Sequence, residues 1–226
     1  MQQRYSKTMT YQDSGKVTIL TKVSKGSPAL LFHTYFARPR SFLFEWTETI
    51  DMPESELGQS FAARLREPGG PERVYRLKGI SRIWSNPHGV FEWYDKTLYR
   101  RERGKVTRVK DLDSAISGAQ GVSLRSASAI ISLLSAQKLT YGFPTVKQPR
   151  FLEERSLNGT KCYRIAGVAF NEPIEVWIEK GDLLVRKIGT GKPGSIIEEI
   201  ISTVHVNEAI PEKQFDPAHA RPIGPK

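Results

Sequence analysis

The sequence predicts an α+β fold, in which helices lie together on one face of an antiparallel sheet. Three observations support this prediction. Strand-like alternation dominates the chain up to Tyr94, two amphipathic helical segments follow between residues 112 and 134, and strand-like segments resume at Phe151. One domain over residues 1–226 is expected, because β-rich chains of this length commonly form one, and 38% hydrophobic residues are enough for a sizeable core.

The N-terminal part has the pattern of an antiparallel meander. A short helix is expected over residues 4–11, stopping at Gly15. After it, apolar or β-branched side chains recur at every second position, with turn residues between the segments. The predicted strands are Val17–Val23, Leu30–Phe36, Phe42–Trp46, Val74–Trp84 and Val90–Tyr94. The Pro- and Gly-rich stretch Asp51–Glu72 is interpreted as a long excursion from the sheet, with a helical interpretation for Ser55–Leu65.

The middle of the chain predicts two helices, each with one apolar stripe at positions i, i+3, i+4 and i+7. The stripes are Leu112, Ala115, Ile116 and Ala119 in the first helix and Ala127, Ile130, Ile131 and Leu134 in the second. Asp111 is a candidate N-cap for the first helix, Gly121 a stop signal after it, and Ser126 a candidate N-cap for the second.

The last third predicts strands again. Asn158-Gly159 is a strong hairpin signal between the first two of them. The expected strands are Phe151–Leu157, Lys161–Ala166, Ile174–Ile178, Leu183–Ile188 and Ile196–Val206. Helices inserted midway into an antiparallel run give the α+β class.

The charge and the apolar runs restrict the classes of partner. The formal net charge is +10, which favours anionic partners, yet no nucleic-acid-binding motif supports specific nucleic-acid recognition. The densest basic stretch, Arg100–Lys110, is interpreted as solvated strands and a loop, with a contact patch as the alternative. No apolar run reaches membrane-spanning length and Met1–Thr10 lacks a signal-peptide apolar region, so the chain is expected to be soluble. Cys162 is the single cysteine and is expected to be a buried, inert thiol.

The sequence predicts no catalytic, metal or cofactor site. Gly189, Gly191 and Gly194 match G-x-G-x-x-G, but Pro193 lies inside the motif and a strand follows, so a hairpin loop is predicted there instead of a dinucleotide site. The four histidines lack metal-site spacing, and adjacent acids such as Glu198 and Glu199 point to opposite faces of a strand. We therefore expect no enzyme, no metal and no cofactor.

Large aromatic side chains are unusually frequent in the predicted strands. Each is most simply explained as core, but a curved sheet so rich in rings can also enclose an apolar cavity. The candidate ligand-binding residues are Phe32, Phe36, Phe42, Phe44, Trp46, Trp84 and Trp93 from strands, with Ile130, Ile131 and Leu134 from the second helix.

Several short motifs resemble the LolA-like outer-membrane lipoprotein carrier superfamily. In Ala37–Trp46 an Arg-Pro pair precedes a strand that ends in Trp, as in the family signature after the second strand. The segments Ile83–Asn86 and Gly89–Tyr94 are similar to the family's Trp-bearing hairpin, and Asn207–Pro211 with Phe215 and Pro217 is similar to its C-terminal ending. The helix over Ala127–Leu134 and the residues before it are closer to secreted relatives than to the carrier itself. The long excursion, and an Asn86–Gly89 turn in place of the usual Asp-Gly, depart from the family pattern.

The resemblance implies an unclosed antiparallel β-barrel, a strongly curved sheet whose concave apolar face is covered by helices. It also implies an extracytoplasmic, for example periplasmic, non-catalytic binding protein for a lipid or the acyl chain of an acylated protein. Arg38 matches the family arginine that hydrogen-bonds to the helical lid, the alternative being a turn residue that caps exposed carbonyls. A protein-interaction or envelope-sensor domain without a lipid ligand is the alternative function. A monomer and peripheral contact with an anionic membrane surface are further expectations.

Overall fold

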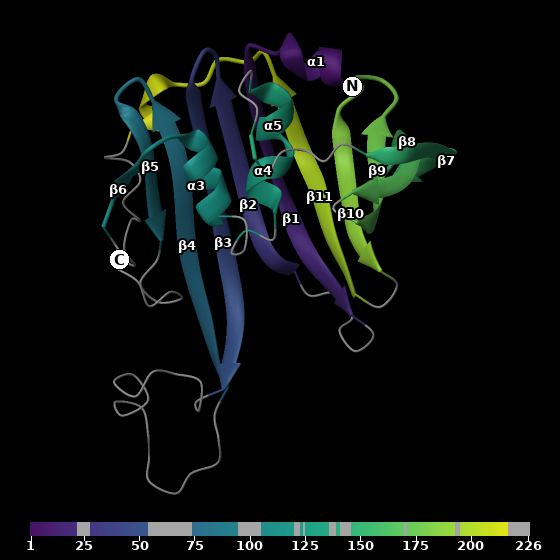
Figure 1. The fold of residues 1–226 in the computed structure, drawn as a ribbon, viewed down its shortest axis with the longest axis horizontal. Coiled ribbons are helices and arrows are strands. Elements are labelled where there is room, and N and C mark those ends of the chain that lie inside the picture. The colour runs from purple at the N-terminus through teal and green to yellow at the C-terminus, as the bar shows by residue number, and fades with distance from the viewer. Residues whose placement is uncertain are drawn as a thin grey trace, which may run out of the picture.

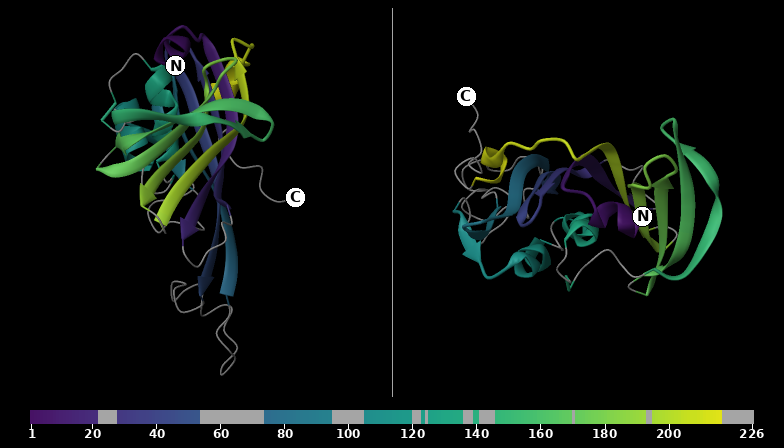
Figure 2. Two further views of the ribbon diagram at one scale, coloured as in Figure 1. Left: turned by 90° about the vertical axis from the view of Figure 1, so that its right-hand side faces the viewer. Right: turned by 90° about the horizontal axis from the view of Figure 1, so that it is seen from above.

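A computed structural model describes most of the chain: residues 1–21, 28–53, 74–94, 105–119, 123, 125–135, 139–140, 146–169, 171–192 and 195–216. In these residues the dominant feature is one 11-stranded sheet in which every neighbouring pair is antiparallel (Figure 1). The strand order is β6-β5-β4-β3-β2-β1-β11-β10-β9-β8-β7. The first and last strands of this order do not pair with each other, so the sheet is open, and it is curved (Figure 2).

The sheet consists of two meanders joined by β1 and β11, which come from opposite ends of the chain and pair along most of their length. The N-terminal meander contains β1 (Thr10–Thr21), β2 (Pro28–Ala37), β3 (Ser41–Pro53), β4 (Val74–Asn86), β5 (Gly89–Tyr94) and β6 (Thr107–Val109). The C-terminal meander contains β7 (Lys147–Leu157), β8 (Thr160–Ala169), β9 (Glu172–Glu179), β10 (Val185–Lys192) and β11 (Ser195–Val206).

The α-helices lie together on one face of the sheet, which we call the helix-side face (Figures 1 and 2). They are α1 (Gln2–Ser6), α3 (Leu112–Ala119), α4 (Ser126–Ala129) and α5 (Ile131–Leu134); a 3-10 turn, η2 (Glu212–Phe215), follows the last strand. The opposite face is called the far face. The α+β class and the antiparallel sheet predicted from the sequence are confirmed.

The alternation of the strands sorts their side chains between the two faces. The helix-side face carries the main core, in which strand residues such as Phe32, Trp46 and Val176 share one buried cluster with Ile116 of α3 and Leu134 of α5. A smaller cluster on the far face contains Leu43, Trp84, Trp93 and Phe215. The C-terminal turn η2 therefore packs on the face away from the helices.

The N-terminus differs from the prediction of a helix up to Gly15. The helix α1 ends at Ser6, and β1 already begins at Thr10. Gly15 lies within β1 at a shift in the pairing with β11. A Cβ there would clash with the Phe32 ring and the Ile200 carbonyl oxygen. This glycine thus reflects close packing inside a strand and not a helix stop.

The second predicted helix is broken into α4 and α5, which are separated by Ile130. Ser126 is not its N-cap but its first residue, after Arg125 in a left-handed conformation with φ 72°. Ser123 accepts a hydrogen bond from the Ala127 N–H and so supplies the capping oxygen. For α3 the prediction is confirmed, because the Asp111 carboxylate accepts a hydrogen bond from the Ser114 N–H at 2.8 Å.

The hairpin predictions are also confirmed. Asn158 and Gly159, with φ of 49° and 87°, connect β7 and β8 in the left-handed geometry that this pair favours. The pairing of Lys192 with Ser195 makes β10 and β11 a hairpin, not a dinucleotide-binding unit. Asp51–Pro53 belong to β3 and not to the predicted excursion. The rest of that stretch, including Ser55–Leu65, lies outside the described residues, as do Gly121 and Arg100–Gly104. Among the described helices, none is long and apolar enough to cross a membrane.

Candidate functional site

The aromatic residues of β2 and β3 form a continuous layer beneath the helices. The ring centroids of Phe32 and Phe44 lie 5.8 Å apart, those of Phe44 and Trp46 5.5 Å, and those of Trp46 and Tyr94 5.9 Å. Antiparallel pairing explains the layer, because Phe32 lies opposite Trp46 and Phe36 opposite Phe42. Phe32, Phe44 and Trp46 are buried, and Tyr94 at the end of the layer is half-buried.

The predicted ligand-binding residues divide between the two faces of the sheet. Eight of them share the main core: Phe32, Phe36, Phe42, Phe44, Trp46, Ile130, Ile131 and Leu134. Trp84 and Trp93 instead belong to the far-face cluster. The register explains this difference, since Trp84 lies opposite Leu43 and therefore points away from Phe42 and Phe44. Ligand binding by these residues remains a prediction.

Arg38 joins the helical layer to the sheet. It lies in the turn between β2 and β3, and its Nε donates a hydrogen bond to the Thr8 carbonyl oxygen at 2.8 Å. Its Nη2 donates to the carbonyl oxygens of Ser6 at 2.8 Å and of Leu134 at 3.0 Å. One guanidinium thus contacts the end of α1 and the last residue of α5, both of which leave carbonyls without partners inside their own helices. These contacts with carbonyl oxygens fit both expectations for Arg38, a tether to the helices and a residue that caps exposed carbonyls, and lid tethering remains a prediction.

Two carboxyl groups, Asp13 and Glu199, are buried in the main core. The sequence analysis placed Glu199 on the opposite face of its strand from Glu198 but predicted the burial of neither acid. Asp13 Oδ2 accepts a hydrogen bond from the Tyr11 hydroxyl at 2.8 Å, whereas Asp13 Oδ1 and Glu199 Oε1 are buried without a hydrogen-bond partner among the described residues. Burial raises the pKa of Asp13 to about 6, against the effect of hydrogen bonds from Thr34 and Tyr11. Burial, and then the charge of Asp13, raise the pKa of Glu199 well above its usual range. Unsatisfied acids of this kind are unusual inside a core.

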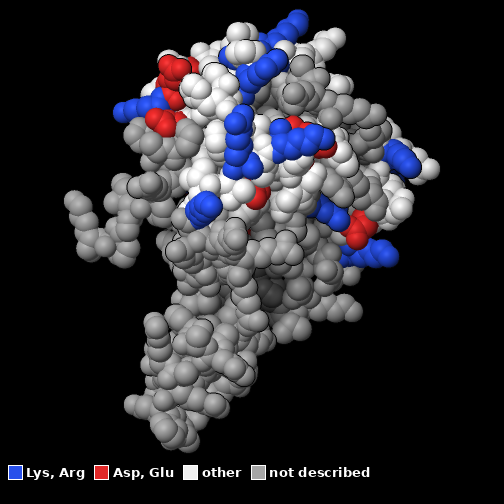
Figure 3. All heavy atoms as spheres, turned by 60° about the vertical axis from the view of Figure 1, so that its left-hand side comes forward, with Lys and Arg blue, Asp and Glu red and all other residues white. Residues whose placement is uncertain are grey.

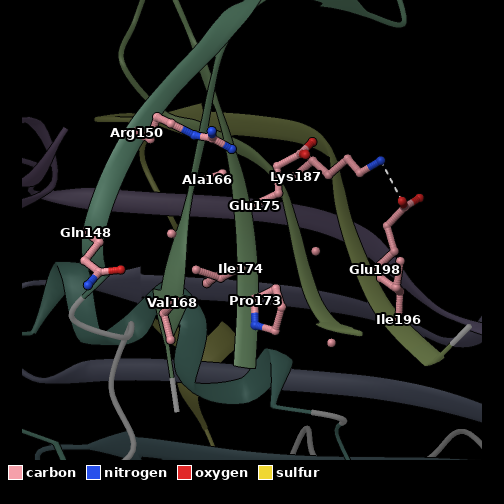
Figure 4. Close-up of a pocket in the computed structure, with 13 residues that line it drawn as sticks. Gln148, Arg150, Ala166, Val168, Pro173, Ile174, Glu175, Lys187, Ile196 and Glu198 are labelled. Carbon is pink, nitrogen blue, oxygen red and sulfur yellow. Dashed lines mark ion pairs between the residues drawn. The ribbon is translucent and has the colours of Figure 1, made fainter. Parts of the chain in front are cut away.

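A groove of about 720 Å³ lies over the C-terminal meander. Figure 4 shows it with Arg150 reaching from β7 across Ala166, and with Lys187 and Glu198 on the opposite side. Its lining residues are Gln148, Arg150, Ala166, Gly167, Val168, Pro173, Ile174, Glu175, Lys187, Gly189, Gly191, Ile196 and Glu198. The groove opens on the far face, because Ile174, Val176 and Ile188 belong to the main core and their strand neighbours Glu175, Lys187 and Gly189 must point the other way.

Strand pairing arranges the groove in two rows. One row runs Arg150, Ala166, Glu175, Gly189 and Glu198 across β7 to β11. The next row contains two pairs, Val168 with Pro173 on β8 and β9 and Gly191 with Ile196 on β10 and β11. The first row is charged and the second is apolar. One sequence signal could have indicated this groove, because Gly189 and Gly191 alternate within a strand. The sequence analysis interpreted both glycines as part of a hairpin loop.

Most charges at the groove are paired. Lys187 Nζ lies 2.6 Å from Glu198 Oε1, and Glu175 Oε2 lies 2.9 Å from Nη2 of Arg164, a residue just outside the lining. Hydrogen bonds from Arg164 lower the pKa of Glu175 although its burial acts in the opposite direction. Arg150 forms no ion pair with any other described residue. The groove therefore combines an apolar row with one cation, Arg150, that pairs with no acid of the described residues.

Metal chemistry finds no support in the described part of the chain, where no group of three or more His, Cys, Asp or Glu side chains could hold a metal ion. Cys162 is buried and unpaired, as predicted. Burial also raises the pKa of its thiol.

No protein-family model matches the sequence, and no curated protein matches it either. Solved structures do match, and the three that follow are 10–13% identical to this chain. The chain is similar to LprF from Mycobacterium bovis, with 11% identity, a TM-score of 0.40, and coverage of 93% of this chain and 91% of that one. It is also similar to the lipoprotein LppX from Mycobacterium tuberculosis, with 13% identity, a TM-score of 0.40, and coverage of 93% and 95%.

A LolA superfamily protein from Nitrosomonas europaea is similar as well, with 10% identity, a TM-score of 0.33, and coverage of 94% of this chain and 92% of that one. That superfamily is the one whose motifs the sequence resembles.

Proposed function

We propose that this protein is a non-catalytic binding protein for an apolar ligand, a lipid or the acyl chain of an acylated protein, and that it acts outside the cytoplasm. The observation that carries the proposal is the contact of Arg38 with the Leu134 carbonyl oxygen at 3.0 Å. A single side chain of the sheet holds the free end of a short helix whose apolar residues cover the aromatic layer.

In this proposal α4 and α5 form a cover over a concave helix-side face. Two helices of four residues each have little stability of their own and depend on packing against the sheet. Moving them would uncover Phe32, Phe44 and Trp46, which are now in contact with one another. An acyl chain of about 14 carbons that replaced the cover would gain on the order of 10 kcal/mol before binding costs, at about 0.8 kcal/mol per CH₂.

The test combines native mass spectrometry of protein purified from cells with titration of a fluorescent fatty acid. We expect a co-purified lipid mass, or micromolar binding of the probe. Arg38→Gln should accelerate probe binding roughly tenfold, because hydrogen bonds to charged groups contribute about 1.5–3 kcal/mol each to the closed state. Arg40→Gln, an exposed arginine in the same turn, is the matched control. Protein that carries no lipid and binds no probe would exclude the proposal.

A protein-interaction or sensor domain remains the second candidate, and one observation favours it. The eight predicted helix-side residues are buried against one another and fill the face with their own side chains. If these side chains stay packed against one another, the face needs no ligand to fill it, and the domain can serve as a scaffold for a partner protein. An absence of lipid in the same experiment, together with an Arg38→Gln variant that gains no probe binding, would support this candidate.

A further inference from the structure

Close packing requires glycine at some positions of the sheet but not at Gly189. A Cβ at Gly15 would clash with Phe32 and the Ile200 backbone, and a Cβ at Gly167 would clash with Val146 and lie 2.8 Å from the Lys147 carbonyl oxygen. A Cβ at Gly189 would meet nothing within 4 Å, and no positive φ requires glycine there. Glycine weakens a strand interior and often marks a place where a ligand approaches closely. Packing thus requires two of these glycines, whereas Gly189 leaves space open.

The open space has the size and chemistry of a small-molecule site. Its volume of about 720 Å³ lies within the roughly 300–1,000 Å³ typical of ligand pockets. The row of Val168, Pro173, Gly191 and Ile196 offers an apolar floor toward one end of the strands. In the charged row, Glu198 is already paired with Lys187, and Glu175 is paired with Arg164.

We propose that this groove is a binding site, separate from the helix-side face, for a single-chain amphiphile with an anionic carboxylate head. The alkyl chain lies over the apolar row and Gly189, and the Arg150 guanidinium binds the head. Charge complementarity selects the head, because Arg150 is the lining cation that no described acid neutralises. Figure 4 shows Arg150 extended over the groove from β7, on the side opposite the Lys187–Glu198 pair.

Gln148 adds a second feature at the same end of the groove. It lines the groove and has a φ of 51°, a left-handed conformation that is uncommon for a residue other than glycine. This backbone lies at the shift in the pairing of β7 with β8, between Lys147 and Arg150. The irregular pairing places Arg150 opposite Ala166, next to the open floor.

The experiment measures the binding of dodecanoate and of the uncharged dodecanol to the whole chain by calorimetry and amide chemical shifts. Dodecanoate should bind to the wild type and shift the amides of Ala166, Val168 and Ile196. Gly189→Leu fills the space and should abolish this binding. Arg150→Gln should weaken dodecanoate about tenfold, the effect of losing one charged hydrogen bond, and leave dodecanol unchanged.

The controls are matched by residue type. Gly181→Leu adds the same side chain at a turn where a Cβ meets only Glu179 Oε1 at 3.7 Å, and Arg155→Gln removes an exposed cation of the same strand. Neither should change binding, and thermal melts identify any variant that fails to fold. Arg38→Gln acts on the helical cover and should not alter dodecanoate binding in the groove, which separates this site from the proposed function.

Three results would overturn the inference: no dodecanoate binding by the wild type, undiminished binding by a folded Gly189→Leu variant, or chemical shift changes confined to the helix-side face. Equal weakening of dodecanoate and dodecanol by Arg150→Gln would overturn the selection of an anionic head.

Discussion

At the scale of single residues, Asp13 and Glu199 distinguish the main core from an ordinary apolar one. Both are buried on the helix-side face, and each has one oxygen without a hydrogen-bond partner among the described residues. Such groups favour the protonated form, because burial opposes charge. The stability of the fold should therefore depend on pH through these acids.

Asp13 gives a prediction with a definite sign. Its folded pKa of about 6 lies above the usual value of 3.8, so the folded state binds the proton more tightly than the unfolded state. The resulting stabilisation is present below about pH 4 and is lost as the pH rises through 6, by roughly 3 kcal/mol for a difference of about two pKa units. Asp13→Asn should remove most of this decline between pH 4 and 7 in urea unfolding experiments.

The control for this prediction is Glu212→Gln, which changes an exposed acid. Its free energy of unfolding should follow the wild-type pH dependence. An Asp13→Asn variant with the same pH dependence as the wild type would show that Asp13 does not titrate in this range.

The sequence predicted the aromatic layer but not the burial of Asp13 and Glu199, for a physical reason. Alternation shows that Phe42, Phe44 and Trp46 share one face, since they lie in one strand. It cannot show that Trp84 faces the other way, because that depends on the register between β3 and β4. The pairing of β1 with β11 likewise buries Asp13 and Glu199, and these residues are far apart in sequence.

At the scale of elements, the break between α4 and α5 bears most on the proposed function. The stripe of Ala127, Ile130, Ile131 and Leu134 was predicted correctly as buried, but the helix was predicted as continuous. Periodicity reports which side chains face the sheet, whereas the break at Ile130 is not encoded by a proline or glycine. At Gly15 the opposite occurred, because a glycine is present but does not end a helix. It allows close packing within a strand.

Leu134→Asp tests whether α5 acts as a cover. Leu134 is 1% exposed, so an unpaired carboxylate at this position would cost several kcal/mol if the helix could not move. If α5 can move away from the sheet, the carboxylate can reach water, and the cost is limited to the free energy of opening the cover. We therefore expect the free energy of unfolding to fall by about 2 kcal/mol, or Tm by roughly 4–8 °C. Fatty-acid binding to the helix-side face should weaken at least tenfold.

Ile83→Asp is the matched control, because Ile83 is fully buried on the same face but belongs to β4, a strand that is paired on both sides. We expect this variant to be unfolded. If Leu134→Asp is as destabilising as Ile83→Asp in the same thermal melts, α5 is part of a rigid core and the cover has no support.

At the scale of the whole molecule, the open sheet explains why fold class was more predictable than the site. Strand and helix periodicity in local segments was enough to indicate an α+β antiparallel architecture. The far-face groove depends on the joint register of five strands, β7 to β11, which no local pattern specifies. The hydrogen bond from Arg38 to the Leu134 carbonyl oxygen likewise joins two residues that are 96 positions apart.

The net charge of +10 is a property of the whole molecule and leads to the last prediction. On the face shown in Figure 3 the Lys and Arg side chains of the described residues are scattered among Asp, Glu and uncharged residues. Scattered charges attract an anionic surface without specific geometry, at up to about 1 kcal/mol for each basic residue close to a membrane. We therefore expect binding to phosphatidylglycerol vesicles in flotation assays at about 50 mM salt, and none to phosphatidylcholine vesicles.

This binding should fall at least tenfold at about 200 mM salt, because the screening length shortens and exposed charges are no longer felt at a distance. Duplex DNA provides the comparison, since its phosphates attract the same side chains. Purely electrostatic DNA binding should weaken as steeply over this range. DNA affinity that persisted at about 200 mM salt would require contacts beyond net charge. Nucleic-acid recognition would then replace membrane contact as the explanation of the positive charge.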